Sequence, residues 1–183
     1  MRIHLKGRGP RAAAALAVAG LLTLAASADV TAAGATPEAG PAAARPQAQA
    51  HRAPTRAEIQ ALFEDWNAAL ATGDPEAVAD LYAPDAALEP TLSNVIRTDR
   101  AGIVDYFEHF LAQSPSGEID QSYVEILGHD AAVDSGAYTF HLTDPATGQA
   151  RDVAARYTFV YERDRHTGEW LIVDHHSSAM PEG

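Results

Sequence analysis

The sequence predicts an α+β protein whose first part is helical and whose second part is a mainly antiparallel sheet. Between residues 55 and 111, apolar side chains recur at helical spacing. From residue 118 onward they alternate with polar ones, and β-branched and aromatic residues become frequent. Turn sequences at 144–148 and 164–168 separate the later strands. Helices that precede consecutive strands are expected to pack on one face of their sheet.

The expected helices have recognisable start and stop signals. Thr55 with Glu58 three residues later forms a capping box, and Gly73 ends the helix that they begin. An Asp-Pro-Glu sequence then starts a short second helix, expected over 74–82. A third helix is expected over about 99–111, with an apolar stripe of aromatic and aliphatic residues.

A short strand is expected over 86–89, and four longer strands are expected to form an antiparallel meander over 119–127, 132–143, 152–163 and 170–178. The last two strands form a hairpin. In the first of them, alternation predicts an interior face that carries Tyr157 and Phe159. By the same parity, the second should turn four residues inward: Leu171, Val173, His175 and Ser177.

Two polar residues therefore end an apolar row. A buried polar group without a partner costs roughly 1–3 kcal/mol. His175 and Ser177 are thus predicted either to be hydrogen-bonded in the core or to line a cavity.

The beginning of the chain predicts export. Four basic residues precede an apolar run over 12–26, and Ala-Ser-Ala at 26–28 fits a signal peptidase site, so residues 1–28 are interpreted as a signal peptide. Residues 29–54 are rich in Ala and Pro with scarcely any large apolar side chain, which predicts a disordered linker. The folded domain is then 55–183, and we expect the protein to be secreted, with no membrane attachment after cleavage.

Composition narrows the classes of partner. Cleavage before Asp29 removes four basic and no acidic residues, which leaves 9 Lys+Arg against 25 Asp+Glu and a formal charge of −16. Nucleic acid is therefore not an expected partner. The chain has no cysteine, so disulfide scaffolds are excluded. No Walker loop, dinucleotide-binding glycine pattern or serine nucleophile elbow is present, and no cofactor is expected.

Three sequences carry a family resemblance: WNAALATGDPEA at 66–77, LEPTLSNVI at 88–96 and GEWLIVDHHSSAMP at 168–181. Together with the element order, they resemble the nuclear transport factor 2-like superfamily, and most closely its calcium/calmodulin-dependent protein kinase II association-domain branch. The resemblance covers the whole expected domain. The sequence contains neither a glycine-rich nucleotide loop nor the HRD and DFG motifs, so no kinase activity is expected.

The resemblance implies a cone-shaped fold in which helices close against a strongly curved sheet and leave a pocket between them. Where the kinase branch has pocket arginines, this chain has Phe159, Ser177 and His141. The resemblance therefore implies a more neutral, ligand-binding pocket, for which the expected residues are Trp66, Tyr82, His141, Tyr157, Phe159, His175 and Ser177.

His175 and Glu89 are the candidate catalytic residues, because histidine exchanges protons near neutral pH and a desolvated carboxylate can act as a base. The outer sheet face often mediates contacts in the superfamily, and the candidate interface residues are Arg156, Asp174, His176 and Ser178. No metal is expected, since adjacent strand residues such as His175 and His176 point to opposite faces.

The leading hypothesis is a secreted protein that forms a homodimer or higher homo-oligomer and binds a small, partly apolar molecule. The alternative is a small enzyme of the ketosteroid isomerase or polyketide cyclase kind. A second titratable group that faces His175 across the pocket would favour the enzyme, because proton transfer of this kind uses a paired acid and base.

Overall fold

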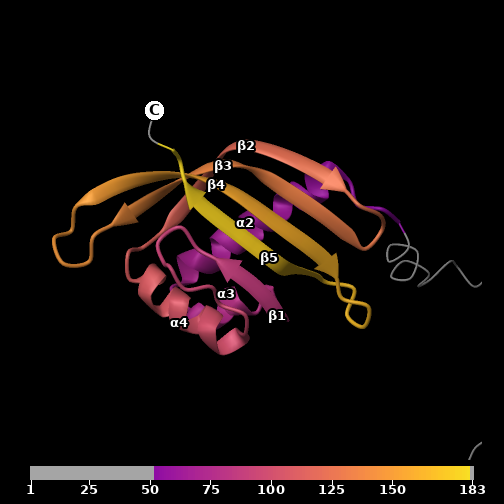
Figure 1. Ribbon diagram of the computed structural model, residues 1–183, viewed down its shortest axis with the longest axis horizontal. Coiled ribbons are helices and arrows are strands. Elements are labelled where there is room, and N and C mark those ends of the chain that lie inside the picture. Colours follow the sequence, from indigo (N-terminus) through magenta and orange to yellow (C-terminus); the bar gives the residue numbers. More distant parts are fainter. Residues whose placement is uncertain (1–51, 182–183) are drawn as a thin grey trace, which may run out of the picture. The chain divides into compact units, whose positions relative to one another are not determined.

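The computed structural model describes residues 52–181, and these residues form an α+β fold in which helices come first and most strands follow (Figure 1). The helical part comprises α2 (Arg56–Thr72), α3 (Pro75–Ala79) and α4 (Arg100–Leu111), with strand β1 (Tyr82–Glu89) between α3 and α4. The strands that follow are β2 (Ser116–Ile126), β3 (Ala131–Thr143), β4 (Ala150–Arg163) and β5 (Trp170–Ala179).

The strands form one curved sheet in the order β1-β5-β4-β3-β2. β2 to β5 make the expected antiparallel meander, and β1 pairs with β5 in parallel. β1 begins at Tyr82, four residues earlier than predicted, and α3 ends at Ala79 instead of continuing to Tyr82. Pro84 explains part of this difference, because the residue before a proline avoids the helical region and favours extended backbone.

The predicted capping box of α2 is present. The Thr55 hydroxyl accepts a hydrogen bond from the Glu58 amide, and Gly73 closes the helix with a φ of 70°. The residues that α2 buries are Ile59, Phe63, Trp66 and Leu70. This stripe packs against the aromatic inner face of the sheet, where the Phe63 ring lies 6.3 Å from those of Tyr138 and Phe159. Edge-to-face pairs of this kind contribute about 0.5–1.5 kcal/mol each beyond burial.

The predicted parity of β4 is correct, and that of β5 is wrong in its first half. Tyr157 and Phe159 are buried, whereas in β5 Ile172 is buried and Leu171 and Val173 are only half-buried. The register between the two strands shifts, so that Tyr161 pairs with Ile172 but Val160 pairs with Asp174. The extra residue of this bulge reverses the alternation. His175 and Ser177 nevertheless point inward, as predicted.

A second bulge shifts the register of β2 between Ile119 and Gln121, next to Gly136 of β3, which pairs with Ser122. A Cβ atom at Gly136 would lie 1.8 Å from the carbonyl oxygen of Gln121, so a side chain cannot be placed there. The same carbonyl accepts a hydrogen bond from the Tyr157 hydroxyl at 3.3 Å. A glycine is therefore required for this close approach of the two backbones.

The predicted signal peptide and most of the predicted linker lie outside the described residues. Among the helices of residues 52–181, none is long and apolar enough to cross a membrane.

Candidate functional site

A small cavity, called the inner cavity below, lies between the helices and the inner face of the sheet. Its volume is about 20 Å³, which is enough for about one water molecule. Most of its lining is apolar or aromatic, and the full set of lining residues is Trp66, Leu88, Pro90, Thr91, Leu92, Tyr106, Phe107, Phe110, Tyr138, Phe140, Leu142, Val153, His175 and Ser177.

His175 is the most unusual of these residues, because only 3% of its surface is exposed. Its ring stacks on that of Phe159 with 3.9 Å between centroids, and it meets the Trp66 ring edge to face. Nδ1 lies 2.9 Å from the hydroxyl of Tyr82, which also accepts a hydrogen bond from Trp66 Nε1 at 3.1 Å. Nε2 is buried and has no hydrogen-bond partner among the described residues.

Burial lowers the pKa of His175 to about 3, and the neighbouring His176 contributes in the same direction. The imidazole is therefore neutral at physiological pH. A buried neutral histidine with one ring nitrogen unpaired can bind a polar ligand atom, but it is a weak base.

Ser177 connects the cavity to the loop that follows β1. The Tyr138 hydroxyl donates to Ser177 Oγ at 2.5 Å, and Ser177 Oγ also contacts the Thr91 hydroxyl. Burial raises the pKa of Tyr138, so its hydroxyl stays protonated. The three hydroxyl groups thus hold Thr91 against the cavity.

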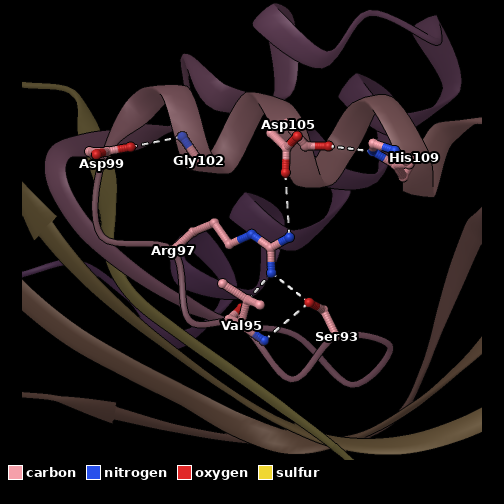
Figure 2. A network of polar contacts seen from close by, with 7 residues as sticks. All are labelled: Ser93, Val95, Arg97, Asp99, Gly102, Asp105 and His109. Carbon is pink, nitrogen blue, oxygen red and sulfur yellow. Dashed lines mark hydrogen bonds and ion pairs between the residues drawn. The ribbon is translucent and has the colours of Figure 1, made fainter.

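The loop from Pro90 to Arg97 is held by backbone hydrogen bonds at its base and by side-chain contacts of Arg97. Leu88 and Arg97 exchange two backbone hydrogen bonds, of 2.8 and 3.0 Å. Figure 2 shows the Arg97 guanidinium between Ser93, Val95 and Asp105. It donates at 2.5 Å to Ser93 Oγ and to the Val95 carbonyl, and it lies 3.5 Å from an Asp105 carboxylate oxygen.

A groove runs outside this loop along α4 and has a volume of about 360 Å³. Arg97, Asp105 and His109 supply its polar side. The groove and the inner cavity share three lining residues: Leu92, Tyr106 and Phe110. The two spaces are therefore neighbours, and Leu92, which is 43% exposed, is the loop residue that borders both.

The structure brings some of the predicted pocket residues together and places others elsewhere. Trp66, His175 and Ser177 line the inner cavity. Tyr82 and Phe159 contact the ring of His175 but are not among the residues that line the inner cavity.

Tyr157 and His141 lie away from the cavity. The Tyr157 hydroxyl donates to the Gln121 carbonyl on β2 and to the Asp134 carboxylate on β3. His141, expected in the pocket, is about half exposed on the opposite side of β3, with Nδ1 2.8 Å from a carboxylate oxygen of Asp152. Asp152, and more weakly Glu118, raise the pKa of His141. Alternation along β3 explains its position, because the neighbouring Phe140 and Leu142 point inward.

Glu89 does not face His175 either. The parallel pairing of β1 with β5 places Leu88 opposite His175 and Glu89 opposite His176. The Glu89 carboxylate lies 2.7 Å from Nδ1 of His176, and both side chains are partly exposed. This pair therefore belongs to the outer sheet face.

The candidate interface residues lie on that same face. Arg156 and His176 are exposed, and Asp174 and Ser178 are half-buried. Burial and the nearby Glu89 raise the pKa of Asp174. No group of three or more potential metal-binding side chains gathers within residues 52–181.

One buried polar residue that was not predicted for the site is Asp134, which is 1% exposed. It accepts hydrogen bonds from Ser122 Oγ at 2.7 Å and from the Tyr157 hydroxyl at 3.3 Å, and burial raises its pKa. Asp134 has the same parity on β3 as the inward-pointing Ala132 and Tyr138, and this alternation could have identified it as a buried residue. Thr91 was not predicted either, and its contact with Ser177 joins positions 86 residues apart.

Comparison with known proteins adds a family and three informative relatives. Residues 55–181 match the family model of the calcium/calmodulin-dependent protein kinase II association domain. An association-domain structure from Xanthomonas campestris is 58% identical to this chain, with a TM-score of 0.66. The match covers 69% of this chain and 88% of the chain in that structure. A nuclear transport factor 2-like superfamily protein from Salmonella enterica shares the fold at 19% identity, with a TM-score of 0.60 over 69% of this chain and 91% of its own. A steroid Δ-isomerase from Nocardioides simplex is 31% identical over 93 residues, which are 51% of this chain and 70% of the relative.

Proposed function

This chain belongs to the calcium/calmodulin-dependent protein kinase II association-domain family, and we propose that it is a secreted protein that self-associates and binds a small, partly apolar molecule in the inner cavity. We propose no kinase activity for it, since the sequence lacks the kinase motifs.

The observation that carries the ligand-binding part is the unpaired Nε2 of the buried His175 in a cavity with apolar walls. Buried polar atoms nearly always have a hydrogen-bond partner, and one without a partner beside a cavity is typical of a site that a ligand completes. Ser177 and Thr91 add hydroxyl groups to the same lining. Ligand pockets commonly combine an apolar wall with a few polar groups of this kind.

Self-association is supported by the family and by the outer sheet face. An association domain is named for joining subunits, and its fold is the fold of this chain. The face around Arg156 and His176 is partly exposed and mixes charged, polar and apolar side chains. A homodimer or higher homo-oligomer that uses this face fits both observations.

The relationship to a steroid Δ-isomerase favours the alternative, a small enzyme that moves a proton on a carbonyl compound. Such chemistry uses a base and an acid that face each other across the substrate. No Asp or Glu is among the residues that line the inner cavity, and Glu89 lies on the outer sheet face. The pKa of His175, about 3, also makes it a poor base. Binding is therefore the function that the geometry supports better.

One experiment tests both functions. Small molecules that co-purify with the full chain from its native culture are released by denaturation and identified by mass spectrometry, then added back to the emptied protein. Binding with 1:1 stoichiometry supports the proposal. Chemical turnover of the same compound would replace it with the enzyme, and a preparation that retains and rebinds nothing would contradict both.

A further inference from the structure

We propose that the inner cavity selects an uncharged molecule that presents a hydrogen-bond acceptor, such as a carbonyl oxygen, to an Nε2–H group of His175. This inference rests on the proposed ligand-binding function and specifies the chemistry of the ligand.

The first step is the position of the proton on the His175 ring. Trp66 Nε1 can only donate, so the oxygen of Tyr82 accepts its hydrogen bond. Within residues 52–181, the acceptor that the Tyr82 hydroxyl hydrogen then has is Nδ1 of His175, at 2.9 Å. In the opposite tautomer, Nδ1 would donate to Tyr82, and the buried hydroxyl hydrogen would have no acceptor, which is unfavourable. The chain of hydrogen bonds therefore runs from Trp66 through Tyr82 to Nδ1.

It follows that Nε2 carries the hydrogen of the neutral ring. Because Nε2 is buried and has no partner among the described residues, this N–H group is a donor without an acceptor. A ligand that completes the site must therefore supply an oxygen or nitrogen with a free lone pair.

The hydroxyl groups of the cavity lead to the same conclusion. Tyr138, Ser177 and Thr91 carry three hydroxyl hydrogens, but only two hydrogen bonds join them. Tyr138 donates to Ser177, so the hydrogen that is left over belongs to Ser177 or to Thr91, and both line the inner cavity. The polar side of the cavity thus offers one hydroxyl donor in addition to Nε2–H of His175.

The rest of the lining excludes a charged ligand. No Asp, Glu, Lys or Arg lines the inner cavity, and Arg97 belongs to the outer groove. An anion would be buried without a cation, which is strongly unfavourable in an apolar surrounding. A cation would likewise be buried without a carboxylate to balance its charge.

The size of the cavity indicates where such a ligand enters. A volume of about 20 Å³ is too small for an organic molecule, so the ligand must displace part of the wall. Leu92 and Thr91 are on the loop, and Leu92 also borders the outer groove of about 360 Å³. When Leu92 moves outward, the two spaces join, and the loss of the Thr91 contact leaves Ser177 free to bind the ligand.

Three probes of nearly equal shape test the inference on the full chain by isothermal titration calorimetry. Acetophenone is neutral and carries an acceptor, isopropylbenzene is neutral without one, and benzoate is an anion. We expect acetophenone to bind roughly tenfold more tightly than isopropylbenzene, because only it pairs the buried donor. We expect benzoate to bind roughly a hundredfold more weakly than acetophenone.

Equal affinities for acetophenone and isopropylbenzene would overturn the inference and leave ligand binding as such intact. Tight benzoate binding would overturn it in favour of an anion site. If none of the three binds, the inference fails together with the proposed binding of small, partly apolar molecules at this cavity.

A second measurement needs no ligand. Long-range ¹H–¹⁵N NMR spectra distinguish a protonated from an unprotonated ring nitrogen. We expect Nε2 of His175 to be protonated and Nδ1 not, and the Nε2 signal to shift on addition of acetophenone. The opposite tautomer would refute the proposed donor directly, and His175→Phe should abolish the preference for acetophenone.

Discussion

The hydroxyl of Tyr82 lies 2.9 Å from Nδ1 of His175 and 3.1 Å from Nε1 of Trp66, so one oxygen joins the start of β1 to β5 and to α2. All three side chains are at least 95% buried. The free energy of folding therefore depends on this oxygen more than on an ordinary surface hydroxyl.

We expect Tyr82→Phe to lower the free energy of unfolding by about 2–4 kcal/mol, because it leaves two buried polar groups without a partner. Urea denaturation measures the change. Tyr123→Phe is the matched control: Tyr123 is 66% exposed, and its loss should change stability by less than about 0.5 kcal/mol. Equal effects of the two substitutions would show that the buried contact contributes nothing.

Stability should fall in mild acid because of His175. Its pKa in the folded chain, about 3, is below its ordinary value of 6.5, so between these values the unfolded chain binds a proton that the folded chain does not. The stabilisation is complete above pH 6.5 and is lost as the pH falls toward 3. At pH 5 the loss should be about 2 kcal/mol.

Chemical denaturation of wild type and of His175→Phe at pH 7.5 and pH 5 checks this expectation. The phenylalanine keeps a ring against Phe159 but cannot titrate, so the variant should lose less stability than wild type over this interval. Identical losses in the two proteins would assign the effect to other groups.

Self-association is expected to depend on the outer sheet face. Light scattering on the full chain at micromolar concentration should report at least twice the mass of one chain, and Arg156→Glu should reduce that mass. Arg165→Glu makes the same charge change in an exposed turn between β4 and β5, and it should have no effect. A monomeric wild-type protein would contradict the proposed assembly.

Export is expected to remove residues 1–28. N-terminal sequencing of protein recovered from the culture supernatant should therefore begin at Asp29. Recovery of intact Met1 from a membrane fraction would contradict both the signal peptide and the proposed secretion.

Much of the fold could be predicted because its signals are local. The capping box at Thr55 and the αL glycine at Gly73 fix the ends of α2 within a few residues of sequence. Alternation predicted the inner face of β4 for the same reason. It failed for the first half of β5, because no residue type there marks the bulge near Ile172.

The candidate site was less predictable, because its contacts join distant parts of the chain. Inward parity identified His175 and Ser177, but their partners Tyr82 and Thr91 are 93 and 86 residues away. Only the folded sheet reveals that Glu89 is opposite His176 and not His175. His141 was placed by family position alone, and the alternation along β3 turns it outward.

The two backbone hydrogen bonds between Leu88 and Arg97 close the base of the loop that carries Thr91 and Leu92. Residues at the loop tip can therefore change without altering the pairing of the sheet. In evolutionary terms, the pairing of the sheet and the loop residues that border the proposed binding site can therefore vary separately. Homologues could acquire different selectivities through a few substitutions between the two ends of this loop, while the interior that keeps the fold intact stays the same.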